Sequence, residues 1–83
     1  MPYITLEARR PLAKAVSDLE DLIFKPGDLA YVIYSLLLHL CKDQPYEQIA
    51  AWRGAAQDAI AEHYRRFVAH YEDSKIVDNG DIL

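Results

Sequence analysis

The run from Leu29 to Cys41 constrains the fold more than any other part of the chain, because it is apolar on almost every side of a helix. The pair Pro26-Gly27 precedes this run and Pro45 follows it, and both interrupt helices. A helix that is apolar all round has to be covered by neighbouring elements. We therefore predict a central, buried helix over residues 28–42, with Asp28 as its N-cap.

One amphipathic helix is expected on each side of this central helix. Apolar residues recur at three-to-four spacing over residues 5–24, where Thr5 can cap a short first turn and Pro11 can open the next helical segment. A longer helix is predicted over residues 45–73, followed by a tail over 74–83 in which Asn79 or Gly80 adopts the conformation that ends a helix. The sequence thus predicts a single all-α domain of residues 1–83, a three-helix bundle-like fold with an apolar central helix and a long C-terminal helix.

The long helix carries two seams that could contact other helices. The first, called the apolar stripe below, consists of Ile49, Trp52, Ala56, Ile60, His63, Phe67 and Tyr71. The second is a seam of small residues, Ala50, Gly54 and Ala61, which would let another helix backbone approach closely. Because this helix outruns the central helix and the domain is small, we expect self-association through the small-residue seam and Trp52.

Composition and charge exclude several classes of protein. With 52% hydrophobic and 27% charged residues among 83, the chain is typical of a globular domain. A net charge of −4 makes nucleic acid an unlikely partner, because non-specific affinity for phosphate backbones comes from Lys and Arg. The longest apolar run is too short to cross a bilayer. The single cysteine, Cys41, fits a reducing compartment, and we expect a cytoplasmic protein.

The sequence favours a non-catalytic protein without a cofactor or metal. Cys41 and Ser35 lie within an apolar run, Ser17 and Ser74 lack a glycine elbow, and a glycine-rich phosphate loop is absent from the sequence. His63 and His70 are seven residues apart on one helix, which separates them by about 10 Å, whereas two helical zinc ligands sit best four residues apart. We interpret these histidines as packing residues.

The best candidates for a ligand site are Arg65 and Arg66, flanked by His63 and Tyr64, with Lys42 from the central helix. Guanidinium groups bind phosphate or carboxylate bidentately, and aromatic faces stack on bases. Ordinary ion pairing with Glu62 or Glu72 would also satisfy both arginines. Both interpretations stay open at this point.

The chain resembles, over nearly its whole length, a family of small bacterial and bacteriophage proteins without an established activity. The resemblance rests on Met1-Pro2-Tyr3-Ile4 at the start, on Gly27-Asp28-Leu29 with Tyr31-Val32-Ile33 in the middle, and on Tyr64-Arg65-Arg66, Tyr71-Glu72-Asp73, Lys75-Ile76 and Asn79-Gly80-Asp81 at the end. Members of the family often have proline before Tyr-Glu-Asp, where this chain has His70. The departure predicts a straighter third helix.

Two functions remain as hypotheses. The first is a non-catalytic helical interaction protein that forms a homo-oligomer, with a phage or mobile-element role implied only by the resemblance. The alternative is an oligomer that binds or sequesters a small anionic ligand such as a nucleotide, held by Arg65, Arg66, His63, Tyr64 and Lys42.

Overall fold

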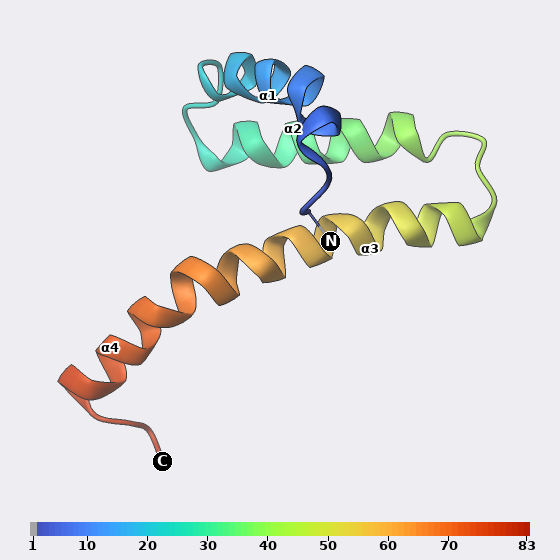
Figure 1. Cartoon of the computed structure of the whole chain (residues 1–83). Coiled ribbons are helices and arrows are strands. Elements are labelled where there is room, and N and C mark those ends of the chain that lie inside the picture. Colours follow the sequence, from blue (N-terminus) through green and yellow to red (C-terminus); the bar gives the residue numbers. More distant parts are fainter. Residues whose placement is uncertain (1) are drawn as a thin grey trace.

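The computed structural model describes residues 2–83, which form helices joined by short connections (Figure 1). The helices are α1 (Leu6–Glu20), α2 (Pro26–Leu40), α3 (Tyr46–His63), the π-helical segment η1 (Tyr64–Val68) and α4 (Ala69–Asn79). The last three run on without a break and act as one long helix. The predicted all-α class and three-helix architecture are confirmed. Met1, which belongs to the predicted terminal motif, lies outside the described residues.

The first helix is one continuous element from Leu6 to Glu20, shorter than the predicted 5–24. Thr5 caps it, because its Oγ1 accepts a hydrogen bond from the Ala8 N–H at 3.2 Å. Pro11 does not open a second segment as predicted; it lies inside the helix and simply lacks an N–H to donate. The helix ends early because Pro26 favours an extended Lys25 (φ −132°, ψ 153°), so the chain has to leave the helical conformation beforehand.

The second helix begins at Pro26, two residues before the predicted start, so Asp28 is not its N-cap. Proline suits the first helical turn, where its missing N–H would have no partner in any case. Asp28 instead lies one turn in and reaches back, where its Oδ2 accepts hydrogen bonds from the N–H groups of Phe24 at 3.0 Å and Lys25 at 3.1 Å. This is one half of a capping box, and it fixes how the chain enters α2.

The turn between α2 and α3 reverses the chain, so the two helices form an antiparallel hairpin (Figure 1). The second helix ends at Leu40 rather than at residue 42, because Asp43 adopts a left-handed conformation (φ 58°) that a helix cannot accommodate. Pro45, predicted as the first residue of the third helix, is its N-cap.

The long helix extends further than predicted and contains an irregularity that was not foreseen. It continues to Asn79, so residues 74–79 belong to α4 and only Gly80–Leu83 form the tail. Within η1 the Ala69 N–H donates to the Tyr64 carbonyl five residues earlier, which inserts one extra residue in the helix. Gly80 ends the helix with φ 88°, and its N–H donates to the Ile76 carbonyl at 2.8 Å.

The helices do not enclose a core in one chain. Among residues 2–83 none is fully buried, and the predicted burial of α2 is limited to half-buried positions such as Val32, Ile33 and Leu37. The accessible surface is 7631 Å², whereas a folded monomer of this mass exposes about 5,000 Å². The radius of gyration is 16.5 Å, compared with about 12 Å for a compact domain of this length. The chain is therefore extended, with a large apolar surface.

We predict that the same substitution has opposite effects at two glycines. Gly54 has a helical conformation, and a Cβ added there meets no atom within 4 Å, so Gly54→Ala should raise the free energy of unfolding by about 0.5–1 kcal/mol. Gly80→Ala should lower it by roughly 1 kcal/mol, because a side chain is strained at its positive φ. Urea denaturation followed by circular dichroism measures both. A stabilised Gly80→Ala variant would contradict the role of Gly80 as the helix stop.

Candidate functional site

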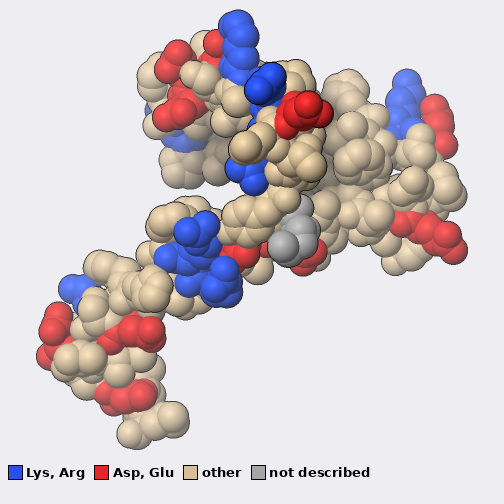
Figure 2. Space-filling model, viewed as in Figure 1, with Lys and Arg blue, Asp and Glu red and all other residues tan. Residues whose placement is uncertain are grey.

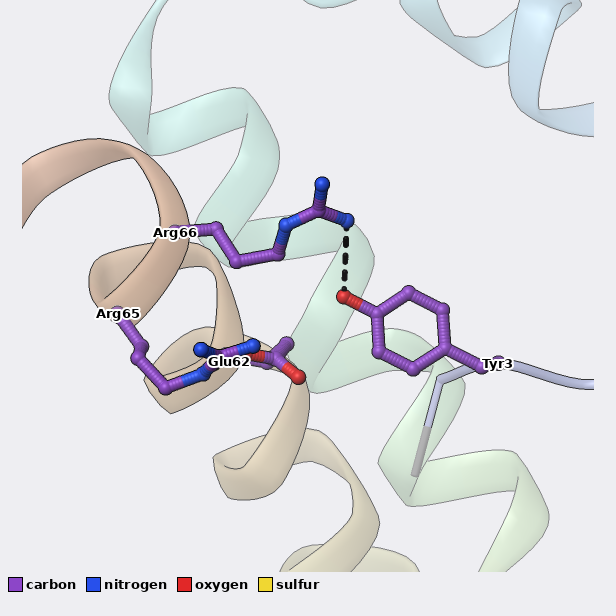
Figure 3. Close-up of polar contacts among 4 residues, drawn as sticks. All are labelled: Tyr3, Glu62, Arg65 and Arg66. Atoms are coloured by element: carbon purple, nitrogen blue, oxygen red, sulfur yellow. Dashed lines mark hydrogen bonds and ion pairs between the residues drawn. The ribbon is translucent and has the colours of Figure 1, made fainter.

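The arginine pair lies on η1, just past the middle of the long helix. Figure 2 shows basic atoms gathered there, with acidic atoms beyond them toward the C-terminal end, where α4 and the tail contain Glu72, Asp73, Asp78 and Asp81. Arg65 Nε donates to Glu62 Oε1 at 2.5 Å, one helical turn away, in an ion pair whose carboxylate side chain is only 18% exposed (Figure 3). The positive charge of Arg65 is therefore largely balanced by the Glu62 carboxylate of the same chain.

Arg66 makes a different contact, with a residue 63 positions away in the sequence. Its Nη1 donates to the hydroxyl of Tyr3 at 3.2 Å, so the segment before α1 is held against the long helix (Figure 3). Its guanidinium also lies 5.4 Å from the centre of the Phe67 ring, within the range of a cation–π contact. Phe67 in turn packs against His63, with the two ring centres 5.6 Å apart. A cation, a phenol and two further rings thus converge at η1.

The electrostatics of this cluster follow from the ion pair. The hydrogen bond from Arg65 lowers the pKa of the Glu62 carboxyl below its ordinary value of 4.5, and partial burial opposes this effect. The same hydrogen bond raises the pKa of the Arg65 guanidinium above its ordinary value. Glu62 is therefore a carboxylate, and Arg65 a cation, throughout the physiological range of pH.

Four of the five predicted ligand residues lie next to one another along the long helix, and their side chains leave it at successive steps of about 100°. His63, Tyr64, Arg65 and Arg66 are consecutive at the junction of α3 and η1, where the Tyr64 side chain is 51% exposed. Lys42 is not brought to them. It lies in the turn before α3, about 30 Å along the helix from Arg65.

Lys42 instead borders a hollow of about 620 Å³ between the end of α2 and the start of α3. Leu37, Leu38 and Ile49 give this hollow apolar walls, and Tyr34 and Cys41 also line it. Its polar lining comes from His39, Lys42 and Arg53. We call it the α2–α3 hollow. It combines an apolar surface with two cations, so it suits an apolar group that carries negative charge nearby.

The residues of the predicted interface lie on α3. Ala50 and Ala61 are exposed, Gly54 is half-buried and Trp52 is 41% exposed. Ala61 borders a smaller hollow of about 300 Å³ together with Pro2 and Asp58. The N-terminal segment therefore reaches one end of the small-residue seam.

The three histidines do not come together in the described part of the chain. His39 lines the α2–α3 hollow, His63 contacts Phe67 and His70 lies on α4. Across residues 2–83, we find no group of three or more His, Cys, Asp or Glu side chains placed to hold a metal ion. None of the helices within residues 2–83 is both long and apolar enough to span a membrane.

Comparison with known proteins identifies the family. Residues 1–82 match a family described as a domain of unknown function, DUF6899. The chain belongs to this family. The match covers α1 through the tail, so the fold described above is that of a DUF6899 domain. No curated protein and no solved structure matches the chain.

Sequence reasoning missed two features of this DUF6899 domain. Tyr3 was not expected to contact Arg66, because the two residues are 63 positions apart and neither has a local pattern that predicts the other. Arg53 was not expected in a site, since it is a single cation on a helix with mixed polarity. Its spacing of four residues from Ile49 was the available signal, because that spacing puts both side chains on one helix face.

We predict that Glu62 makes stability depend on pH. A carboxyl with a lowered pKa in the folded state contributes stability that is present above its unfolded pKa and is lost as the pH falls through its folded pKa. Glu62→Gln should therefore lower the melting temperature near pH 7, and the difference from wild type should shrink below about pH 4. Thermal denaturation between pH 7 and pH 3 measures this difference.

The control for this prediction is Asp18→Asn. Asp18 pairs with Lys14 at 3.1 Å, and both side chains are largely exposed, so the substitution should change stability little. A Glu62→Gln variant that differs from wild type equally at all pH values would contradict the ion pair as the source of the effect.

Proposed function

We propose that this DUF6899 domain is a non-catalytic helical interaction protein that assembles with copies of itself. The observation that carries the proposal is the excess of exposed surface in a single chain. The excess over a compact monomer is about 2,500 Å², which is comparable with the area that one subunit contributes to an extensive permanent interface.

The exposure of the apolar stripe changes along the long helix. Ile49 and Ala56 are half-buried near α2, whereas Ile60 is 62%, Phe67 64% and Tyr71 60% exposed. The cover within the chain thus ends part-way along one continuous face of the long helix. A second copy carries the same uncovered face, so two chains can cover each other.

The first helix supports the same proposal. Its large apolar side chains are poorly covered by the rest of the chain, since Leu12 is 54% and Val16 61% exposed. Exposed apolar patches of this extent mark contact sites in soluble proteins. The resemblance of the terminal motifs adds a link to bacteriophages or mobile elements, and the free thiol of Cys41 agrees with action in the cytoplasm.

The test is to place a charge on the apolar stripe. Ile60→Lys should convert the oligomer to a monomer at micromolar concentration, because a buried charge in an interface costs several kcal/mol. On an isolated chain, the same change at a residue that is 62% exposed should alter the free energy of unfolding by about 0.5 kcal/mol or less. Light scattering coupled to gel filtration separates these two results.

The matched control is Val77→Lys. Val77 is 82% exposed and lies about 120° around α4 from Tyr71, away from the apolar stripe. This variant should keep the oligomeric state of the wild type. A wild-type protein that remains a monomer at the highest accessible concentration would rule out the proposal.

A second candidate function is the binding of a small anionic ligand such as a nucleotide. The cluster at η1 favours it, because the guanidinium of Arg66 donates to a phenol rather than to a carboxylate and so keeps its charge available. Arg65, Tyr64 and His63 are its neighbours along the helix, and a phosphate with a stacked base needs a cation and an aromatic face. Oligomer formation would allow two such clusters to face one ligand.

A thermal-shift screen with nucleoside mono-, di- and triphosphates tests this candidate. A ligand present at one hundred times its Kd should stabilise the protein by about 2.7 kcal/mol, which is a shift of several degrees. Arg66→Ala should abolish the shift, whereas Arg10→Ala on α1 should preserve it. The absence of any shift at millimolar nucleotide would eliminate this function.

A further inference from the structure

The α2–α3 hollow and the segment that follows α4 have complementary chemistry. The hollow has apolar walls with Lys42 and Arg53 among its lining residues, and no carboxylate is found among the described residues that line it. The segment from Asp78 to Leu83 contains two carboxylates, no cation and the apolar pair Ile82-Leu83. Negative charge and apolar side chains thus occur together in the segment, as positive charge and apolar walls do in the hollow.

The apolar pair has no cover within the chain. Ile82 is 101% and Leu83 108% exposed, which makes them the most exposed large apolar residues of the described structure. Asp81 Oδ1 accepts a hydrogen bond from the Leu83 N–H at 3.2 Å, which is a local turn over residues 81–83. Burying two such side chains against an apolar surface is favourable, because it removes their apolar area from water.

This segment cannot reach the hollow of its own chain. The long helix rises about 1.5 Å per residue, which places Asn79 about 39 Å from Arg53. Ile82 lies three residues beyond Asn79, and an extended chain of that length spans only about 10 Å. The turn between α2 and α3 and the segment after α4 lie toward opposite ends of the molecule, whose longest dimension is 49 Å (Figure 1). Only the hollow of another molecule is accessible.

We propose that residues 78–83 of one chain dock in the α2–α3 hollow of a second copy. Ile82 and Leu83 cover its apolar walls, and Asp78 and Asp81 lie near Arg53 and Lys42. This inference rests on the proposed self-association and specifies its geometry. In a symmetric dimer the exchange is mutual, which requires the two long helices to run antiparallel with their centre of pairing in η1. The uncovered part of the apolar stripe then lies within the paired region.

Cys41 allows a direct test, because it lines the hollow and is the only cysteine of the chain. A thiol introduced by Leu83→Cys should form a disulfide with Cys41 of the other copy when a mild oxidant is added. A disulfide requires Cα atoms within about 7 Å, which the two positions of one chain cannot achieve. Non-reducing electrophoresis should show a covalent dimer, and mass spectrometry of its peptides should identify the link between positions 41 and 83.

Two control variants test whether the disulfide between positions 41 and 83 is specific. Val77→Cys introduces a thiol at an exposed position of α4 and should give no link to Cys41. Cys41→Ser combined with Leu83→Cys should remove the link between positions 41 and 83. Both variants change exposed or half-buried positions, so folding can be verified by circular dichroism before oxidation.

The outcomes separate this inference from the proposed function. A link between positions 41 and 83 of different chains supports the docked segment. An oligomer that gives no link, or only links between two copies of position 83, overturns the docked segment and leaves self-association standing. A monomer at all concentrations overturns both.

Discussion

The difference in helix length is the constraint on which the rest of the structure depends. The second helix, with 15 residues, is about 22 Å long, whereas α3, η1 and α4, with 18, 5 and 11 residues, together extend about 50 Å. An antiparallel hairpin of such unequal helices can cover less than half of the longer one. The apolar stripe, which continues along the long helix to Tyr71, therefore leaves the cover of α2 and faces solvent in a single chain. The absence of buried residues within residues 2–83 follows from this geometry.

A few polar contacts hold the open arrangement together. Asp28 fixes the backbone that leads into α2. Tyr3 connects the N-terminal segment to Arg66 on the long helix. These contacts are exposed to water, where each contributes little to stability. They orient the helices more than they stabilise them. Because one chain also leaves much of its apolar surface uncovered, the proposed function places a second copy against that surface.

The sequence predicted the elements much better than their contacts. Thr5 as a cap and Gly80 as a stop are local signals, because each acts on backbone groups within one turn. The prediction placed Asp28 at the N-cap because a carboxylate often stabilises that position, but the preceding proline took the first helical turn and moved Asp28 inside. The tail was predicted too long, since residues 74–79 carry no strong helix breaker and the helix continues until Gly80. The spacing of apolar residues did not predict the extra residue in η1.

In the candidate site, too, some features follow from the sequence and others depend on the tertiary structure. The shared position of His63, Tyr64, Arg65 and Arg66 on the long helix follows from the sequence alone, because the four residues are consecutive. The separation of Lys42 from that cluster, and its position beside Arg53 at the α2–α3 hollow, depend on where two helices meet.

The sequence by itself determined an all-α chain, most of its helix caps and the continuity of the apolar stripe, since these depend on interactions between residues a few positions apart. Only the tertiary structure decided how much of that stripe is covered, which cations line the hollow and that Tyr3 contacts Arg66, because these depend on the angle and overlap of helices that are distant along the chain.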